Sequence, residues 1–245
     1  MKANKNIYFL SDFHLGSPDF NSSKKREKKI ILFLEEIKDK AEEIYLMGDI
    51  FDFWFEYKKV IPKGFVRLLG KLAKLSDNGI AIHFFVGNHD LWVKKYLKEE
   101  IGIIVHYKSK IINEQDKKIF IGHGDELGKG DYLYKFLRRI FTSKICQWAF
   151  SRLHPNLAFS IAHTWSNKSR NQHSLSKDKN KLLISYCKEQ QKFNPVDYYI
   201  FGHTHIPLEL KINKNATYIN LGDWITHSTY AVLEKGELKI KKFKS

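Results

Sequence analysis

The chain is poor in cysteine, with only two among its 245 residues. Cys146 and Cys187 lie far apart and belong to no CxxC or Cys/His pair. This scarcity excludes a disulfide framework and a cysteine-based zinc site, because both need clustered thiols. We therefore expect a protein of a reducing compartment.

Long apolar runs are also missing. No stretch approaches the roughly 20 apolar residues that are needed to cross a bilayer. The N-terminal segment MKANKNIYFLSDFH has a short apolar run that leads directly into charged residues, whereas a signal peptide needs a longer one. The sequence predicts a cytoplasmic protein, for which peripheral contact with a membrane stays open.

Acidic residues are in the minority, with 27 against 42 lysines and arginines, which gives a formal charge of +15. Such an excess favours anionic partners, either nucleic acid, an anionic membrane face or a phosphorylated substrate. Lysines scattered over the whole chain account for much of the excess, so the charge alone does not choose among these partners. Apolar residues at 43% and charged residues at 28% indicate a packed globular protein.

Apolar runs alternate with amphipathic stretches in the first half of the chain, which is typical of strands joined by helices around a buried sheet. We predict strands over 6–11, 43–47 and 80–86, helices over 24–41 and 63–76, and a hairpin over 103–122. Short strands are predicted over 195–201, 208–212, 217–221, 230–233 and 238–243. At this length we expect one domain over residues 1–245.

Residues 128–193 differ from their surroundings, with long helical periodicity, several aromatic residues and many basic ones. They predict a helical insertion within the domain. Apolar positions from Tyr132 to Ala149 recur at helical spacing with cations between them, which predicts one basic amphipathic helix. That helix can pack on its own domain or lie on an anionic membrane. The polar stretch 166–181 predicts a loop.

Five polar clusters follow apolar runs: SDFH at 11–14, GD at 48–49, GNHD at 87–90, GHGD at 122–125 and GHTH at 202–205. Ligands of open α/β sheets gather beyond the carboxyl ends of the strands, so these clusters can be neighbours in space. Taken alone, each is equally compatible with a turn, a cap or a hydrogen-bonded structural histidine. Their recurrence in this order favours one shared site.

The side chains of these clusters are typical metal ligands. Asp12 and His14 are two residues apart, so in extended geometry both would leave the same face of the chain. The two oxygens of Asp49 can bridge two ions. This mixture of oxygen and imidazole donors suits Mn, Fe, Zn or Co, whereas so much nitrogen disfavours calcium.

In this order the motifs resemble those of the calcineurin-like metallophosphoesterase superfamily, over essentially the whole chain. The resemblance implies an α/β fold, a sandwich of two mixed β-sheets flanked by helices, with residues 128–193 as a helical lid. It also implies two divalent metal ions, for which we expect Mn²⁺. The implied ligands are Asp12, His14, Asp49 and His205 for the first ion and Asp49, Asn88, His123 and His203 for the second.

Within the superfamily the chain is similar to the UDP-2,3-diacylglucosamine diphosphatases of the lipid A pathway. The similarity rests on SDFHLG at 11–16, GDIFDFW at 48–54, HGD at 123–125 with Asp131 eight residues after His123, and LGDW at 221–224. It implies hydrolysis of a UDP-linked diacyl glucosamine lipid to UMP and 2,3-diacylglucosamine 1-phosphate, at the cytoplasmic face of the inner membrane. Neither nucleic acid nor an obligate protein partner is implied.

The same resemblance implies contacts between substrate and the insertion. The lid would bind the acyl chains and Asp131 would contact the glucosamine. Ser169 and Arg170 would bind sugar or phosphate, since Arg suits bidentate phosphate contacts. The alternative for the last two residues is an ordinary solvated charge run.

One departure from the narrower family concerns the position after the motif Asn, where its better-known members carry Arg and this chain carries His89. We interpret His89, with Asp90 beside it, as the catalytic pair that protonates the leaving oxygen or stabilises phosphoryl charge. Asp52, Asp125 and Asp90 are candidates for orienting the ligand imidazoles. Asp125 could equally cap its own loop.

Two other functions are compatible with these motifs. A nuclease, or a nucleotide or protein phosphatase of the same superfamily, would carry the same His-Asp pair, and the positive charge would then mean affinity for nucleic acid. The second alternative is a non-catalytic scaffold of the same fold. A scaffold would be expected to have lost metal ligands, whereas here every ligand position is filled.

Overall fold

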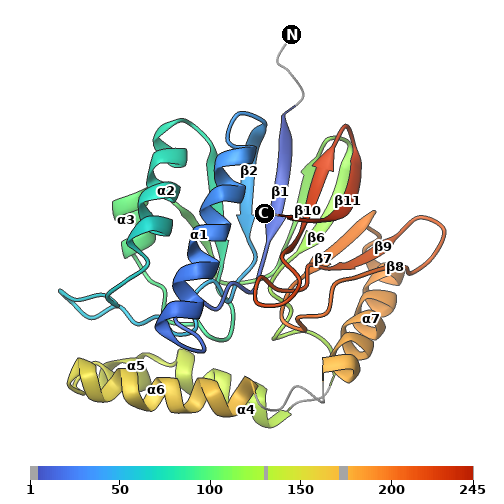
Figure 1. The fold of residues 1–245 in the computed structure, drawn as a ribbon. Helices are drawn as coiled ribbons and strands as arrows, with labels where there is room; N and C mark the ends of the chain where they lie inside the picture. Colours follow the sequence, from blue (N-terminus) through green and yellow to red (C-terminus); the bar gives the residue numbers. More distant parts are fainter. Residues whose placement is uncertain (1–4, 130–131, 171–175, 245) are drawn as a thin grey trace.

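Two β-sheets packed face to face form the centre of the molecule, and helices cover their outer faces (Figure 1). The structure, a computed structural model, describes residues 5–129, 132–170 and 176–244. Among these residues, no helix combines the length and the apolar character that crossing a membrane requires.

The first sheet has six strands, in the spatial order β11-β10-β1-β2-β3-β4. Strands β1 to β4 are parallel to one another, and β10 and β11 add an antiparallel edge. Their bounds are β1 Asn6–Leu10, β2 Ala41–Leu46, β3 Ala81–Phe85, β4 Ile104–His106, β10 Thr229–Glu234 and β11 Glu237–Lys242.

The second sheet has five strands, in the order β5-β6-β7-β9-β8. Strands β6, β7 and β9 are parallel, whereas β5 and β8 run antiparallel to their neighbours. Their bounds are β5 Lys110–Glu114, β6 Lys117–Ile121, β7 Tyr198–Phe201, β8 Leu208–Lys211 and β9 Thr217–Asn220. Both sheets are mixed, so the predicted sandwich of two mixed sheets is confirmed.

Alternate residues of the central strands enter different cores. Ile7 and Phe9 of β1 pack between the sheets, whereas Tyr8 and Leu10 pack beneath the helices of the first sheet. Those helices are α1 (Phe20–Ile37), α2 (Val66–Asp77) and α3 (Tyr96–Ile101). Helix α7 (Ser176–Phe193) covers the second sheet through residues such as Leu183 and Cys187. Because both faces of each central strand are buried, these strands are almost continuously apolar.

Several predicted boundaries were wrong. Helix α1 begins before residue 24 because the Asp19 carboxylate caps it, accepting hydrogen bonds from Asn21 N and Ser22 N at 2.9 Å. The predicted hairpin over 103–122 is confined to β5 and β6, since β4 pairs with β3 in the other sheet. Helix α3 was not predicted at all.

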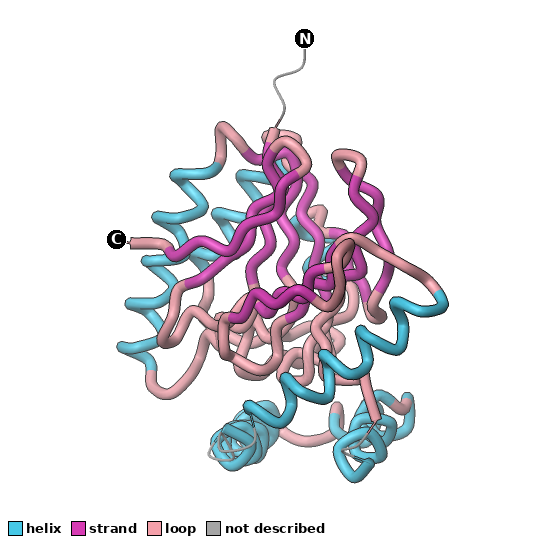
Figure 2. Tube along the Cα trace, turned by 90° about the vertical axis from the view of Figure 1, so that its right-hand side faces the viewer, coloured by secondary structure: helices cyan, strands magenta, loops and turns pink. Residues whose placement is uncertain are grey.

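Three further helices lie across the end of the sandwich at which β1, β2 and β3 terminate (Figures 1 and 2). They are α4 (Tyr132–Thr142), α5 (Lys144–Phe150) and α6 (Pro155–Arg170). The single amphipathic helix predicted over 132–149 is therefore wrong. Ser143 divides it, because its hydroxyl accepts a hydrogen bond from Cys146 N at 3.2 Å and caps α5.

The loop predicted over 166–181 is also wrong for the described part of that stretch. Helix α6 continues to Arg170 and α7 begins at Ser176. The stretch contains neither proline nor glycine, and polar residues suit an exposed helix as well as a loop. Polarity alone therefore could not distinguish the two.

Candidate metal centre

The five sequence clusters meet at one end of the sandwich because the strands before them end there. Parallel strands β1, β2 and β3 of the first sheet, and β6 and β7 of the second, bring their carboxyl ends to this edge. The loops that follow supply seven side chains that the structure brings together: Asp12, His14, Asp49, Asn88, His123, His203 and His205.

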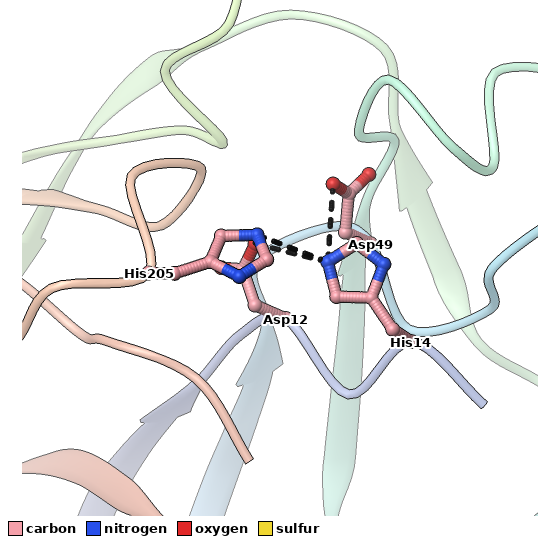
Figure 3. A group of neighbouring side chains, drawn as sticks. All are labelled: Asp12, His14, Asp49 and His205. Atoms are coloured by element: carbon pink, nitrogen blue, oxygen red, sulfur yellow. Dashed lines mark hydrogen bonds and ion pairs between the residues drawn. The ribbon is translucent and has the colours of Figure 1, made fainter. Parts of the chain in front are cut away.

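Four of these side chains form a first group, drawn in Figure 3: Asp12, His14, Asp49 and His205. Each offers a donor atom, and these atoms all lie within 4.8 Å of one another. His14 Nε2 lies 3.1 Å from His205 Nε2, and the latter lies 3.2 Å from Asp12 Oδ1. Asp49 Oδ2 lies 3.7 Å from His14 Nε2.

A second group lies on the other side of Asp49. His123 Nε2 lies 3.4 Å from Asp49 Oδ2 and 3.2 Å from Asn88 Oδ1. His203 Nδ1 lies 2.9 Å from the same Asn88 oxygen. Asp49 Oδ1 accepts a hydrogen bond from the backbone N–H of His89 at 2.8 Å, so Oδ2 is the oxygen that faces an imidazole nitrogen in each group. Asp49 can therefore bridge two cations.

The hydrogen-bond partners of these side chains show that the donor set fits divalent cations. His123 Nδ1 lies 2.8 Å from the carbonyl oxygen of Met47, so this nitrogen must be the donor. In the neutral ring Nε2 then directs a lone pair at the oxygens of Asp49 and Asn88. Acceptor atoms that face one another repel unless a proton or a metal cation lies between them. Asp12 Oδ1 is fully buried and accepts no hydrogen bond from the described residues, which fits the same explanation in the first group.

The electrostatics of the centre also favour positive charge. Burial opposes a charge on His205, but the Asp12 and Asp223 carboxylates raise its pKa to about 10. Burial likewise opposes ionisation of Asp12, but the neighbouring imidazoles of His205 and His14 hold its pKa well below its usual range. Without a metal these carboxylates thus favour the protonated form of His205, whereas burial lowers the pKa of His203 to about 3. A bound cation would displace the proton from His205.

The backbone at the centre is unusual. Five of the ligand residues have positive φ although none is glycine: Asp12, His14, Asp49, His203 and His205. Such conformations cost free energy and concentrate at functional sites. The extended geometry expected for Asp12 and His14 is therefore wrong, since these residues have φ of 56° and 43°.

Two glycines make room for the ligands. A Cβ at Gly87 would lie 2.3 Å from Asp49 Oδ1. A Cβ at Gly202 would lie 2.3 Å from Asp12 Oδ2 and 2.0 Å from Ser11 Oγ. Neither position can hold a larger residue without moving a ligand or its neighbour.

His89 and Asp90 occupy different environments. His89 Nδ1 donates a hydrogen bond to the backbone oxygen of Asp52 at 3.0 Å, and its ring meets the His14 ring edge to face at 4.7 Å. The Asp90 carboxylate instead accepts hydrogen bonds from Gly87 N at 2.7 Å and Ile50 N at 2.9 Å, and it is fully buried. These contacts join the loops that follow β2 and β3, and the catalytic role of Asp90 stays a prediction.

Asp52 and Asp125, two of the predicted orienting carboxylates, contact different parts of the molecule. Asp52 Oδ1 lies 3.6 Å from His14 Nδ1 and 3.8 Å from His89 Nδ1, so it can orient both rings. Asp125 pairs with the insertion, because its Oδ2 accepts hydrogen bonds from Arg138 Nε at 2.7 Å and from the Tyr134 hydroxyl. Asp125 therefore fixes α4 to the loop that carries His123.

One orienting residue was missed. Asp223 Oδ2 lies 3.6 Å from His205 Nδ1, and its Oδ1 accepts a hydrogen bond from Thr226 N at 2.7 Å. Asp223 belongs to the LGDW stretch, which in the sequence supports the family resemblance but predicts no role for this residue. A carboxylate in a motif near the end of a strand was the available signal.

The predicted substrate contacts are described only in part. Asp131 lies outside the described residues, and Ser169 and Arg170 are placed only as the last two residues of α6.

A cavity of about 330 Å³ lies between the metal centre and the insertion. Asn88, His89 and Asp52 line it on the side of the centre. The rest of the wall is mainly apolar and comes from the core loops and from α4, α5 and α6, including Trp92, Leu137, Phe141, Phe150 and Ile161. The Trp92 indole donates a hydrogen bond to the backbone oxygen of Phe141 at 2.7 Å, which fixes α4 over the cavity.

Comparisons with known proteins identify relatives of this chain. The sequence profile of the calcineurin-like phosphoesterases matches residues 5–207. A UDP-2,3-diacylglucosamine hydrolase from Porphyromonas gingivalis is 38% identical over 243 residues, which cover 92% of this chain and 93% of that protein. A UDP-2,3-diacylglucosamine hydrolase from Histophilus somni is 30% identical over 240 residues, covering 94% and 96%. Among solved structures, the E. coli phosphoesterase Yfce matches with a TM-score of 0.48 and 12% identity, covering 97% of this chain and 92% of its own.

Proposed function

The chain belongs to the calcineurin-like phosphoesterase family, and on that premise we propose that it hydrolyses UDP-2,3-diacylglucosamine to UMP and 2,3-diacylglucosamine 1-phosphate. Membership makes it a metal-dependent hydrolase of phosphate bonds. The relatives named UDP-2,3-diacylglucosamine hydrolase match this chain over nearly its whole length, which supports the same activity here.

The observation that supports this substrate best is the apolar cavity beside the metal centre. Its volume of about 330 Å³ lies in the ordinary range for ligand pockets. Asn88 and His89 line one side, whereas aromatic and aliphatic side chains of the insertion line the other. Each methylene group buried there would contribute about 0.8 kcal/mol. A lipid with its phosphate at the centre and its acyl chains under α4, α5 and α6 fits this arrangement, and the insertion would then act as the lid of one domain.

We assign two Mn²⁺ ions to the centre, one among Asp12, His14, Asp49 and His205 and one among Asp49, Asn88, His123 and His203. When bound, paired divalent cations supply a nucleophile at neutral pH and neutralise phosphoryl charge. The protein side chains hold and orient these ligands, with Asp52 and Asp223 behind His14 and His205.

His89 is proposed to act on the phosphoryl group. His89 Nδ1 donates a hydrogen bond to the Asp52 backbone oxygen at 3.0 Å, so Nε2 is the nitrogen left for the substrate. Nε2 would either donate a hydrogen bond to the phosphoryl group or give its proton to the leaving oxygen. The contact between the rings of His89 and His14 keeps the His89 ring beside the first metal group.

The test is to incubate the Mn-loaded protein with UDP-2,3-diacylglucosamine and measure UMP, beside a bis-phosphodiester control. Release of UMP and a lipid monophosphate supports the proposal. Hydrolysis of the diester with the lipid left intact would instead indicate a nuclease or another phosphatase of the same family.

Peripheral contact with the inner membrane, at its cytoplasmic face, is part of the same proposal. Large apolar side chains of α4 and α5 are exposed, among them Ile145 at 80% and Leu133 at 71%, and these two helices contain no buried residue. Basic side chains such as Arg139 and Lys144 lie between them in the sequence. Apolar and basic residues together favour binding to anionic lipid.

Sedimentation with vesicles tests this contact. Phosphatidylglycerol vesicles are expected to carry the protein down and phosphatidylcholine vesicles to leave most of it in solution. The variant Leu133→Ser/Ile145→Ser is expected to lose the binding. Equal sedimentation of this variant and the native protein would exclude the helices as the contact.

A further inference from the structure

A second cavity, of about 750 Å³, lies beside the first. The start of α1, the loop at 60–67 and the start of α6 line it, and we call it the α1–α6 cavity. Phe53 lines both cavities and so separates them. The Phe53 ring is held edge to face against Phe159 of α6, at 5.2 Å.

The α1–α6 cavity adjoins the metal centre. Leu15 and Gly16, which line it, directly follow the ligand His14. A Cβ at Gly16 would lie 3.6 Å from the Cβ of Asp52, and Asp52 both lines the first cavity and faces His14 Nδ1 at 3.6 Å. The two cavities therefore flank the same group of residues.

The two walls differ in chemistry. The wall of the α1–α6 cavity includes three cations, Lys24, Lys63 and Arg67. Among the described residues that line it, the one carboxylate is Glu27, which is buried and accepts a hydrogen bond from Leu68 N at 3.0 Å, so this carboxylate is held at the start of α2. In the first cavity, the described lining residues include one basic side chain besides His89, namely Arg138, which is paired with Asp125.

Aromatic rings complete the wall of the α1–α6 cavity: Phe20, Phe53, Phe65 and Phe159. Rings of this kind offer faces on which a base can stack. Lysine and arginine donate hydrogen bonds to phosphate oxygens and to carbonyl acceptors, and these are the polar groups of a uridine nucleotide.

We infer that the α1–α6 cavity binds the uridine nucleotide half of the substrate, while the apolar cavity binds the diacylglucosamine half. The inference rests on the proposed function, and it deepens that function by assigning the two products to two cavities. The pyrophosphate would span the residues that both cavities adjoin. After hydrolysis, UMP and the lipid monophosphate would leave by separate routes.

Photocrosslinking locates the nucleotide directly. The Mn-loaded protein would be irradiated with 4-thiouridine 5′-monophosphate, and the modified peptides identified by mass spectrometry. We expect adducts in residues 15–24, 60–67 or 155–159. Adducts confined to α4, α5 or the loop at 88–92 would place the nucleotide in the apolar cavity and overturn the inference.

A pair of double variants measures the contribution of the cations. Lys63→Ser/Arg67→Ser removes two cations from the wall, whereas Lys58→Ser/Lys59→Ser removes the same charge from exposed positions that do not line it. We expect UMP binding to weaken about tenfold in the first variant relative to the second. Binding of 2,3-diacylglucosamine 1-phosphate is expected to be equal in both, and equal melting temperatures would show that both fold.

The outcomes separate the inference from the function on which it rests. If the native protein releases no UMP from UDP-2,3-diacylglucosamine, the proposed function fails. If it does release UMP but the two double variants bind UMP equally, only the inference fails. A selective loss of lipid monophosphate binding in the Lys63→Ser/Arg67→Ser variant would assign the cavity to the lipid and also overturn it.

Discussion

Asp49 connects the two halves of the metal centre at the scale of a single residue. Its Oδ1 accepts a hydrogen bond from His89 N at 2.8 Å, and its Oδ2 faces His14 and His123 at 3.7 and 3.4 Å. The carboxylate is buried, and the positive φ of 53° fixes its direction. Both proposed cations would therefore depend on this carboxylate.

Replacing the Asp49 carboxylate by an amide tests whether the binding of both cations depends on it. Asp49→Asn removes the negative charge and leaves only one oxygen, so we expect fewer than two Mn²⁺ per chain and a loss of turnover of about a hundredfold or more. Metal analysis and UMP release measure the two effects. The exposed Asp39→Asn is the matched control, and a variant at Asp49 that kept both ions and full turnover would contradict the assignment.

The two cysteines give a second prediction at this scale. Cys146 lines the apolar cavity, whereas Cys187 is fully buried, and burial raises the pKa of its thiol. A raised pKa leaves little thiolate at pH 8, so a maleimide should modify Cys146 at least about tenfold faster than Cys187. Mass spectrometry measures the ratio. Bound 2,3-diacylglucosamine 1-phosphate should slow the modification of Cys146, and an unchanged rate would argue against a lipid in that cavity.

The candidate metal ligands that the structure brings together could be predicted from the sequence because their residue types and positions after apolar runs are local information. The roles of the other acids could not. Asp90 contacts backbone amides of two loops, Asp125 contacts a helix of the insertion, and Asp223 supports a ligand from another strand. Each role depends on which distant segment folds beside the residue.

At the scale of elements, α4 is fixed to the core by a buried acid. Asp125 accepts hydrogen bonds from Arg138 and Tyr134 of α4, and the pKa of its carboxyl is lowered although burial alone would raise it, because Arg138 and His123 lie beside it. Removing one partner leaves a buried charge without compensation.

We therefore expect Arg138→Met to destabilise the protein by about 3 kcal/mol and to loosen the insertion. Arg139→Met changes the neighbouring, exposed residue of the same helix and should be nearly neutral. Thermal melting gives the stability, and limited proteolysis within residues 132–170 gives the mobility. Equal melting temperatures and equal cleavage of the two variants would show that the pair does not hold α4.

Helices and strands could be predicted where hydrophobic periodicity was strong, as in β1, β2, β3 and α2. Their ends could not, because caps decide them: Asp19 starts α1 early and Ser143 splits α4 from α5. The short helix α3 has too few residues to show a period.

At the scale of the whole molecule, the two-sheet sandwich was predictable through the family resemblance, whereas strand order was not. Strands β4 and β5 are neighbours in sequence but belong to different sheets, and β10 returns to pair with β1. Both faces of every central strand are buried, so the local hydrophobic pattern of a strand does not specify which strand it pairs with.

Metal removal should affect the stability of this whole arrangement. The centre joins loops of both sheets, so each cation bound only to the folded chain stabilises it by about 2.7 kcal/mol at a hundredfold excess over its dissociation constant. For a chain of this length the expected rise in melting temperature from the EDTA-treated to the Mn-loaded protein is roughly 5–11 °C for each bound cation. Asp49→Asn should show a smaller rise, and an equal rise in both would mean that the metal binds elsewhere.

Anomalous diffraction from crystals grown with Mn²⁺ tests the central claim most directly. We predict two peaks about 3.5–4 Å apart on either side of Asp49 Oδ2, one beside His14 and His205 and the other beside His123 and His203. A fully active crystal with no anomalous peak between these side chains would contradict the claim.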